Sequence, residues 1–423
     1  MDSSAAPVVA SAAEPAPRLI FINRYYHPDL SATSQLLHDL TVRLMQRGFA
    51  VHVLCSRQLY EDPLTRLPVS EVIGGVQVHR LRTTRFGRSS MGGRALDYLS
   101  FHAACLVKLL QMLRRGDMVV AKTDPPLISV VAAAAVRLRG ASLINWLQDI
   151  FTEVASKLGV SPLPAILDAA LRRVRDASLR AASLNVVLGE RMGGYLAGRG
   201  ICSSQIRIIE NWSDAVQPLP PQGSKLRAEL KLSECFVVGY SGNLGLAHDF
   251  RAILESAMHL RSDPQIVFLM VGGGANMARL KAQVAQLGLG NMRFLPYQPR
   301  ERLSDSLAAA DVHLACLKPE LEGLIVPSKC YGVFAAGRPL IFIGDPDGDI
   351  PRIVRTFGCG RVVEDGDGLT LAGFISELKG DAAARNTMGS EARRLFLERY
   401  TADRAADKWC AALQEHFRPQ RQG

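Results

Sequence analysis

Short apolar runs alternate with amphipathic stretches along most of the chain. The apolar runs predict strands, and the stretches between them have the three-to-four-residue spacing of helices. The expected strands lie at residues 19–22, 51–54, 76–81, 118–121, 143–146 and 184–187 in the first half, and at 236–240, 266–271, 292–295, 312–315 and 340–343 in the second. Strands that alternate with helices form parallel βαβ units. The pattern therefore predicts an α/β protein with two doubly wound domains facing each other across a cleft.

The domain boundaries follow changes in composition. The segment Gln217–Ser224 is rich in proline and is the strongest linker signal in the chain. In doubly wound sheets ligands bind beyond the carboxyl ends of the strands, so the cleft between the domains is the expected site. The predicted parts are a flexible Ala- and Pro-rich tail at 1–17, a first domain at 18–215, a linker at 216–235, a second domain at 236–398, and a C-terminal helical segment at 399–423 that packs back on the first domain.

The charge balance favours an anionic partner. Among the 423 residues, Lys and Arg number 50 and Asp and Glu 40, which gives a formal net charge of +10. Such a surface suits a phosphorylated substrate or an acidic membrane, and no module that reads nucleic acid is found. The eight Cys are scattered without a CxxC pair, as is typical of a reducing compartment. No apolar run reaches the length of about 18 residues that spans a bilayer, so the expected location is the cytoplasm.

Two glycine-rich segments follow strands of the second half. In Tyr240–Gly245, Gly242 and Gly245 would let backbone N–H groups approach a pyrophosphate, and the next helix offers its positive end. The plain alternative is a glycine-rich turn. For Gly272–Gly274 the turn is the favoured interpretation, because a dinucleotide fingerprint needs a third glycine where Met277 stands.

The segment from Glu322 to Lys329 is the most informative stretch of the chain. Gly323 follows the carboxylate, and a helix is expected to start near Ser328. The N-terminus of that helix, together with Lys329, would make a phosphate site. Glu322 would lie beside it and could hold sugar hydroxyls. The alternative is a capped helix with a solvated Glu and Lys.

Two candidates come from the first domain. Asp149 stands at the carboxyl end of the strand at 143–146, where cleft residues originate, although an N-cap for the next helix is an equal alternative. Ser31 opens the turn Ser31–Ser34, which is expected to cap the first helix with its N-terminus toward the cleft.

Arginines gather in two segments of the first domain. One basic segment with interleaved aromatic residues contains Arg80, Arg82, Arg85, Arg88 and Arg94, and a second cluster lies at 172–180. Solvated charge is the usual explanation. The apolar segments beside them favour an anionic membrane surface or the acceptor as the partner.

The acidic segment Asp345–Asp349 is not predicted to bind a metal ion. Asp345, Asp347 and Asp349 spell a DxD pattern, but the segment is interpreted as a turn away from the other candidates. No metal ion or other cofactor is therefore expected.

Taken together, these segments resemble the retaining glycosyltransferases of family 4, which have the GT-B architecture of two Rossmann-like domains. The stretches NWLQDIFTEVA, GYSGNLGLAHDF and EGLIVPSKCYGVFAAGRP resemble in particular the branch that builds bacterial surface polysaccharides, including O-antigen, L-fucosamine and colanic-acid transferases. The resemblance covers residues 18 to 418.

The resemblance implies transfer of a sugar from a UDP- or GDP-linked donor to a lipid-linked acceptor, with retention of anomeric configuration and without a metal. It places Glu322 against the donor hexose and Asp149 beside the reacting carbon. The donor diphosphate would lie between the Gly242 loop, the helix near Ser328 and the turn at Ser31. The enzyme would act as a peripheral protein at the inner face of the cell membrane.

The chain also departs from the family pattern. The second family Glu, which holds the ribose, is replaced by Cys330, or by Gly332 if the register follows the helix at Ala335. The usual Arg and Lys after the Gly242 loop are replaced by Asn243 and His248. Lys329 is the predicted substitute cation, with His248 as a neutral or charged donor.

Two other functions remain open at this point. A nucleotide-sugar 2-epimerase would share the architecture but needs paired acids for proton abstraction. A degenerate, non-catalytic transferase could act as a scaffold in a polysaccharide assembly complex, as the missing family residues suggest.

Overall fold

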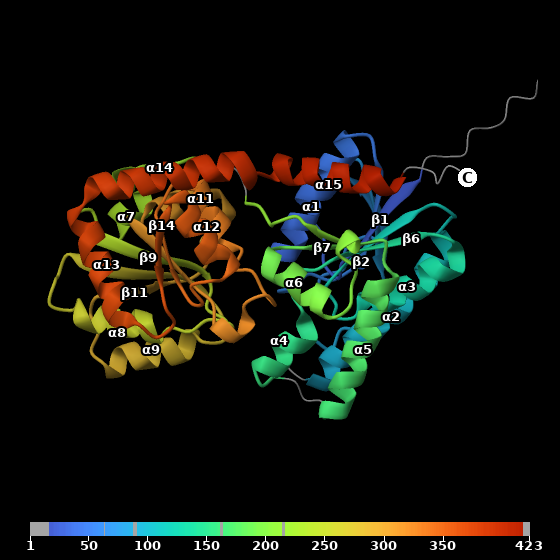
Figure 1. The fold of residues 1–423 in the computed structure, drawn as a ribbon, viewed down its shortest axis with the longest axis horizontal. Helices are drawn as coiled ribbons and strands as arrows, with labels where there is room; N and C mark the ends of the chain where they lie inside the picture. Colours follow the sequence, from blue (N-terminus) through green and yellow to red (C-terminus); the bar gives the residue numbers. More distant parts are fainter. Residues whose placement is uncertain (1–16, 63, 88–90, 161–163, 214–215, 418–423) are drawn as a thin grey trace, which may run out of the picture.

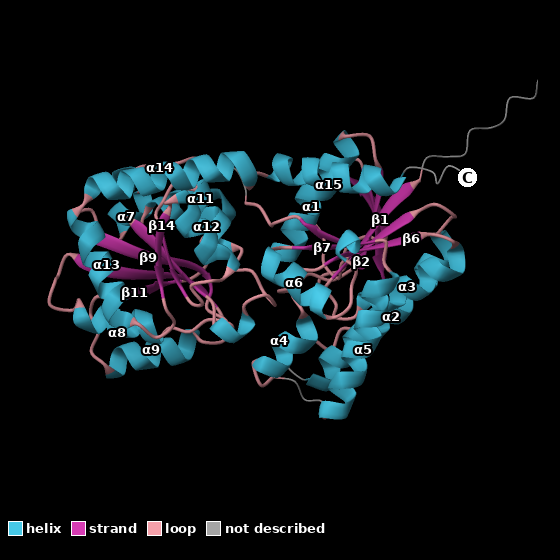
Figure 2. Ribbon diagram, viewed as in Figure 1, coloured by secondary structure: helices cyan, strands magenta, loops and turns pink. Residues whose placement is uncertain are grey.

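The computed structural model describes residues 17–417, apart from 63, 88–90, 161–163 and 214–215. These residues form two α/β units, each with a sheet enclosed by helices (Figures 1 and 2). The predicted fold class is confirmed. We call the unit built on β1–β8 the first domain and the unit built on β9–β14 the second domain. The expected tail at 1–17 lies almost wholly outside the described residues.

The first domain is built on a sheet in which only its edge strand β3 runs antiparallel to its neighbour β4. In the described part of the chain the order is β3-β4-β2-β1-β5-β6-β7-β8. The strand pattern of the sequence missed the two short edge strands, β3 and β8, whose residues are partly exposed. The strands are β1 (Arg18–Ile22), β2 (Ala50–Ser56), β3 (Ser70–Ile73), β4 (Val76–Leu81), β5 (Met118–Lys122), β6 (Ser142–Trp146), β7 (Leu184–Val187) and β8 (Ile206–Ile208).

The second domain has a parallel sheet in the order β11-β10-β9-β12-β13-β14. Five of its strands match the prediction, and the short edge strand β14 was missed. The strands are β9 (Phe236–Asn243), β10 (Ile266–Gly273), β11 (Met292–Leu295), β12 (Val312–Cys316), β13 (Leu340–Ile343) and β14 (Gly360–Val363).

Helices cover both sides of each sheet because successive strand residues point to opposite sides. In β1, Leu19 and Phe21 enter a core with α1 and α15, whereas Ile20 and Ile22 enter a core with α2 and α3. The helices are α1 (Ala32–Gln46), α2 (Met91–Met112), α3 (Ile128–Arg139), α4 (Phe151–Lys157), α5 (Ala165–Ala181), α6 (Glu190–Gly198), α7 (Lys225–Glu229), α8 (Arg251–His259), α9 (Met277–Gln286), α10 (Leu303–Ala308), α11 (Lys329–Ala335), α12 (Asp349–Phe357), α13 (Gly368–Gly380), α14 (Ala382–Arg399) and α15 (Ala402–Phe417).

The last helix returns to the first domain. In Figure 1, α14 runs over the second domain and α15 continues over the first, where it contacts α1. The Trp409 ring is fully buried, with its centroid 6.4 Å from that of Phe21 and 5.1 Å from that of Trp146. The helix from the end of the chain therefore completes the core around the first strand.

The two domains face each other with the carboxyl edges of their sheets. Leu147 and Leu188, which follow β6 and β7, belong to the same buried cluster as Leu324 and Ile350, which follow β12 and β13. A main-chain hydrogen bond also crosses, from the N–H of Ile150 to the carbonyl of Leu324 at 3.0 Å. The loops that carry ligands in this class of sheet therefore meet between the domains.

Candidate active site

The strand orders place a switch point in each sheet. In the second domain, β9 leads to β10 and β11 on one side, while its other neighbour β12 leads to β13 and β14 on the opposite side. The loops that leave β9 and β12 therefore diverge, and a crevice forms between them. In the first domain the same relationship holds between β1 and β5. Both switch points lie at the carboxyl edges that face the other domain.

Gly242 and Gly272 lie side by side at the end of β9 and β10. They are paired in register, and both have φ values, 134° and 140°, that side chains rarely adopt. A Cβ atom at Gly272 would overlap the carbonyl oxygen of Gly242. The two backbones thus approach each other as closely as only glycine allows. Gly242 and Gly272 thus belong to the last residues of β9 and β10 and lead directly into the two glycine-rich segments, which adjoin each other at the carboxyl edge of the sheet.

Lys329 brings the start of α11 to the end of β9. Its Nζ donates to the hydroxyl of Tyr240, lies 3.4 Å from the carbonyl oxygen of Asn243, and lies 4.1 Å from the centroid of the Tyr240 ring. A Cβ at Gly242 would lie 3.9 Å from Nζ. Burial lowers the pKa of Lys329 to about 8. The positive charge therefore lies directly behind the Gly242 turn.

His248 contacts the same ammonium group. Its Nε2 lies 3.4 Å from Nζ of Lys329, and its Nδ1 lies 2.6 Å from the carbonyl oxygen of Cys316, the last residue of β12. Burial, followed by the charge of Lys329, lowers the pKa of His248 to about 3. The structure thus brings together four predicted residues: Gly242, Asn243, His248 and Lys329. Gly245 adjoins them, since its Cβ position lies 2.8 Å from the Asn243 amide nitrogen.

Ser328 precedes this cluster as the N-cap residue of α11 and is exposed. Its side chain makes no capping hydrogen bond. The predicted helix start is therefore confirmed, and the hydroxyl lies on the surface beside Lys329.

Glu322 lies in a second group of residues. Its Oε1 accepts a hydrogen bond from the backbone N–H of Asp349 at 2.9 Å, and burial raises the pKa of its carboxyl. A Cβ at Gly348 would lie only 2.7 Å from the Glu322 carboxyl group. The prediction that the Asp345–Asp349 segment lies away from the other candidates is therefore wrong. Sequence spacing could not reveal that the turn after β13 folds over the turn after β12.

The first domain closes over this second group through α6. The backbone N–H of Arg191 lies 3.2 Å from a carboxylate oxygen of Asp349, and its guanidinium donates to the carbonyl of Asp347 at 2.9 Å. Gly323 has a φ of 76°, and a Cβ there would lie 3.3 Å from the carbonyl oxygen of Arg191. The Glu322 loop is therefore in direct contact with the first domain.

Asp149 meets the Glu322 loop from the other side. It forms an isolated antiparallel bridge with Ile325. Burial, followed by the nearby carboxylate of Asp124, raises the pKa of Asp149 to about 6, and its Oδ1 has no hydrogen-bond partner among the described residues. The N-cap of α4 is Ile150 and has no side-chain capping bond, so the capping interpretation of Asp149 is wrong.

Lys122 is a site residue that the sequence analysis missed. It ends β5, is 1% exposed, donates to the carbonyl of Thr33 at 2.7 Å, and lies 4.0 Å from the Trp146 ring centroid. Burial lowers its pKa well below the usual value. Lys122 and Asp149 both line a small cavity of about 30 Å³. The signal that could have indicated it was a lysine at the end of an otherwise apolar strand, MVVAK.

Ser31 occupies the N-cap position of α1, as predicted, but its side chain makes no capping hydrogen bond. Its hydroxyl donates to Asp29 instead. The first turn of α1 is held by Lys122 through Thr33. The start of α1 therefore lies at the switch point of the first sheet.

The predicted basic residues separate into two groups. Arg85 and Arg94 are exposed, and Arg88 lies outside the described residues. Arg80 and Arg175 are buried, Arg80 against Glu71 and Arg175 against Glu153. The assumption that these last two belong to surface clusters is wrong, because each neutralises a carboxylate inside the first domain. None of the described helices is long and apolar enough to cross a membrane.

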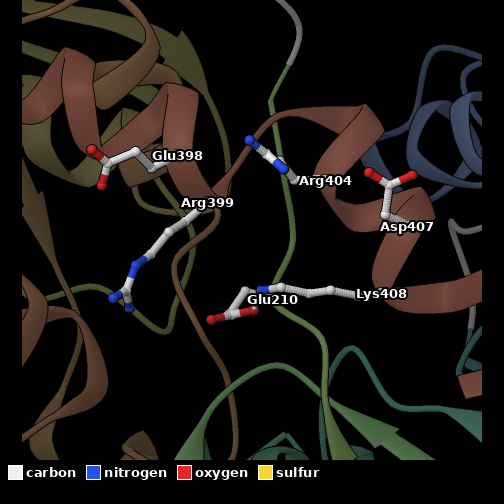
Figure 3. A pocket seen from close by; sticks show the side chains of 6 residues that line it. All are labelled: Glu210, Glu398, Arg399, Arg404, Asp407 and Lys408. Atoms are coloured by element: carbon white, nitrogen blue, oxygen red, sulfur yellow. Dashed lines mark hydrogen bonds and ion pairs between the residues drawn. The ribbon is translucent and has the colours of Figure 1, made fainter. Parts of the chain in front are cut away.

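A different pocket, of about 400 Å³, lies where α14 passes into α15 (Figure 3). Lys408 reaches toward Glu210, and their charged atoms are 2.5 Å apart. The lining residues are Glu210, Glu398, Arg399, Arg404, Asp407 and Lys408. None of the predicted site residues contributes to it. Among the residues that the structure describes, no three His, Cys, Asp or Glu side chains are grouped so that they could hold a metal ion.

The architecture and the paired switch points are those of a two-domain protein of GT-B type, and the family comparison identifies the class of enzyme. Residues 224–395 match the family described as "Glycosyl transferases group 1", and residues 32–212 match the "Glycosyl transferase 4-like domain". The two matches together span most of both domains. The chain therefore belongs to the glycosyltransferases that these two domain models describe.

Individual relatives carry related descriptions. The chain is 26% identical over 309 residues to "Probable glycosyltransferase WbjE" of Pseudomonas aeruginosa, covering 73% of this chain and 76% of that protein. It is 26% identical over 346 residues to "Putative colanic acid biosynthesis glycosyl transferase WcaI" of Escherichia coli K12, covering 78% of this chain and 84% of the other. The structure of Anabaena Alr3699/HepE in complex with UDP-glucose superimposes with a TM-score of 0.70 at 18% identity, covering 94% of this chain and 100% of that one.

Proposed function

We propose that the protein is a retaining glycosyltransferase that moves a sugar from a nucleotide-sugar donor to a lipid-linked acceptor in the biosynthesis of a cell-surface polysaccharide. One observation carries the proposal. The Lys329 ammonium lies behind the Gly242 turn at the switch point of the second sheet, on the edge that faces the first domain. A positive charge behind a glycine, where a ligand can come close to the backbone N–H groups, is suited to bind a donor diphosphate.

The charges assign a role to each residue group. When the donor bond breaks, negative charge grows on the leaving diphosphate, and Lys329 with the backbone of Gly242 and Ser328 would stabilise it without a metal. Glu322 uses only Oε1 for Asp349 among the described contacts, so its other oxygen could hold a donor hydroxyl. Asp149 would lie beside the reacting carbon. Retention then needs no protein nucleophile, because the leaving phosphate itself can take the acceptor proton.

The donor nucleotide proposed first is UDP. Support comes from the similar structure, HepE, which is described in complex with UDP-glucose. GDP is the alternative. Neither Cys330 nor Gly332 offers the carboxylate that the family uses for the ribose, and because both nucleotides carry a ribose, this change favours neither of them. Donor sugars related to L-fucosamine follow from the resemblance to the surface-polysaccharide branch.

The acceptor would approach the first domain from an anionic membrane at the cytoplasmic face. Arg85 precedes α2 and Arg94 lies in its first turn. Leu96 and Leu99, in the next two turns of α2, are 50% and 64% exposed. At the start of α5, Ile166 is 82% exposed. Helix α3 packs between these two helices. Exposed apolar side chains beside arginines are typical of a surface that rests on charged lipid headgroups.

A direct assay tests the transfer. Purified protein is incubated with a panel of UDP- and GDP-sugars and polyprenyl-diphosphate-linked acceptors, and products are identified by mass spectrometry. Transfer with the anomeric configuration retained supports the proposal. A free epimer formed without acceptor would instead support an epimerase. Absence of any product, together with no heat of binding for UDP or GDP, would support the non-catalytic scaffold, which the missing family carboxylate favours.

Vesicle adsorption tests the membrane contact separately. Binding to anionic vesicles should weaken as salt rises, because screening reduces the attraction between exposed charges. The double variant Arg85→Gln, Arg94→Gln should bind less, whereas Arg279→Gln, which changes an exposed arginine on α9 of the second domain, should bind like the unchanged protein. If adsorption is absent or insensitive to salt, the proposed contact with an anionic membrane is wrong.

A further inference from the structure

The ammonium of Lys329 contacts three acceptors from the end of β9 and the loop that follows it. They are the hydroxyl of Tyr240, the carbonyl oxygen of Asn243 and Nε2 of His248, the last two at 3.4 Å. An ammonium group has three N–H donors, so this set can satisfy all of them. Removing any one of the acceptors would leave this half-buried charge partly unsatisfied.

The proton position on His248 follows from its second partner. Nδ1 lies 2.6 Å from the carbonyl oxygen of Cys316, and a carbonyl can only accept, so Nδ1 must carry the proton. In a neutral imidazole, Nε2 is then an acceptor and cannot donate to a ligand. This differs from the expectation that His248 donates a hydrogen bond to the donor phosphate.

We propose that His248 is a positioning residue: anchored to the carbonyl of Cys316, it accepts a hydrogen bond from Lys329 and holds that ammonium behind the Gly242 turn. The proposal deepens the proposed function, because it rests on Lys329 acting on the donor diphosphate. His248 belongs to the loop after β9, Cys316 ends β12 and Lys329 begins α11. The imidazole therefore joins the three segments that border the switch point.

The surroundings keep the pair in this protonation state. His248 is half-buried and faces the cations Lys329 and Lys318, and both its desolvation and these charges disfavour a charged imidazole. Lys329 faces Tyr240, Cys316, Cys330 and His248, and burial disfavours its charge as well. Each acceptor that is removed therefore makes the ammonium easier to deprotonate.

The first experiment needs no catalytic activity. In protein labelled with ¹⁵N-histidine, the ring signals of His248 are assigned by their absence from His248→Gln. The expected result is a neutral ring protonated on Nδ1 throughout pH 5 to 8. A ring protonated on Nε2, or one that titrates within that interval, would overturn the proposal. This measurement holds even if the protein transfers no sugar, so its result is separate from the fate of the proposed function.

A double-mutant cycle on kcat is the second experiment. His248→Leu should lower kcat by about tenfold or more, since hydrogen bonds to charged groups contribute about that much. In the background Lys329→Met, the same change should have little further effect, because the group it positions is gone. Multiplicative losses would mean that His248 acts directly on the substrate, and the proposal would fail.

Two controls separate positioning from general damage. His248→Gln keeps an oxygen acceptor at a similar reach and should recover most of the activity lost in His248→Leu. If the leucine variant does not fold, the glutamine variant still tests the proposal, because a tenfold loss of kcat in His248→Gln would contradict it. His259→Leu removes an exposed histidine at the end of α8 and should leave kcat unchanged.

Discussion

Asp149 of the first domain and Ile325 of the second are joined main chain to main chain in an isolated antiparallel bridge. The next residue, Ile150, extends the connection by donating to Leu324 at 3.0 Å. The two predicted acids, Asp149 and Glu322, therefore stand on loops that are hydrogen-bonded to each other although they come from different domains. Relative movement of the domains must break these bonds before it can separate the two carboxyl groups.

Replacement of Lys329 tests the proposed diphosphate contact. Lys329→Met should lower turnover by about 10²-fold or more, the size of effect seen when one donor to a developing negative charge is lost. Glu322→Ala should cause a loss of the same order. Lys225→Met, at an exposed position on α7, is the matched control and should retain full turnover. Near-normal rates for both site variants would exclude this site.

The rate should also depend on pH through Lys329. Its pKa is lowered to about 8, so the ammonium is present below pH 8 and is lost as pH rises through that value. We expect kcat to fall between pH 7.5 and 9 in proportion to the charged form. In Lys329→Arg the guanidinium stays charged, so the decline should disappear from this interval even if the absolute rate is lower. A decline that persists unchanged in the arginine variant would assign it to another group.

Asp149 should make the protein less stable above pH 6. Its pKa is raised to about 6, so the folded state binds the proton more tightly than the unfolded state, and stability decreases as pH rises from about 4 to 6. Asp149→Asn removes this cost and should raise the free energy of unfolding at pH 8 by about 2 kcal/mol. Urea unfolding at pH 4 and pH 8 measures it: the gain should be much smaller at pH 4. An equal change at both pH values would contradict the prediction.

The close approach at the end of β9 can be tested with one methyl group. In Gly272→Ala the new Cβ would overlap the Gly242 carbonyl, so the turn must move and UDP binding should weaken at least tenfold by calorimetry. Gly373→Ala is the control, because that glycine lies within α13 with no atom within 4 Å of its Cβ position. It should bind UDP normally and unfold at an equal or higher temperature.

The buried pair Glu153 and Arg175 should govern acid stability. Burial would raise the pKa of Glu153, but hydrogen bonds from Arg175, Thr152 and Tyr195 lower it to about 2. Stability should therefore be lost as pH falls from about 4.5 toward 2. Glu153→Gln leaves Arg175 without its main partner and should cost about 3 kcal/mol at pH 7. Glu391→Gln breaks an exposed pair with Arg394 and should change stability by less than about 1 kcal/mol.

Local patterns predicted the fold well where elements are buried on both sides. The runs at 19–22, 266–271 and 340–343, which became β1, β10 and β13, are wholly apolar, and none of these strands lies at the edge of its sheet. Strand β3 was missed because its residues alternate between exposed and half-buried at the antiparallel edge. Such a segment becomes a strand because it pairs with a neighbouring strand, and the pattern of its own residues does not show that pairing.

The same distinction applies to the site. Gly242 and Lys329 could be predicted because a glycine after a strand and a lysine at a helix start have local signatures. The contact between Asp349 and Glu322, and the acceptor role of His248, depend on atoms from separate loops and become visible only in three dimensions. Lys122 was missed because a lysine at a strand end is usually solvated, whereas this one is covered by Trp146 and Thr33.

The position of Trp409 has a consequence for biosynthesis. During synthesis β1 emerges before the whole of the second domain and α15 emerges after it, yet the Trp409 indole lies beside Phe21 and Trp146. The nascent first domain must therefore keep an open apolar face until synthesis has passed through the second domain and reached α15. An exposed apolar face promotes aggregation, so truncation before α15 should yield an aggregating product rather than a smaller folded one.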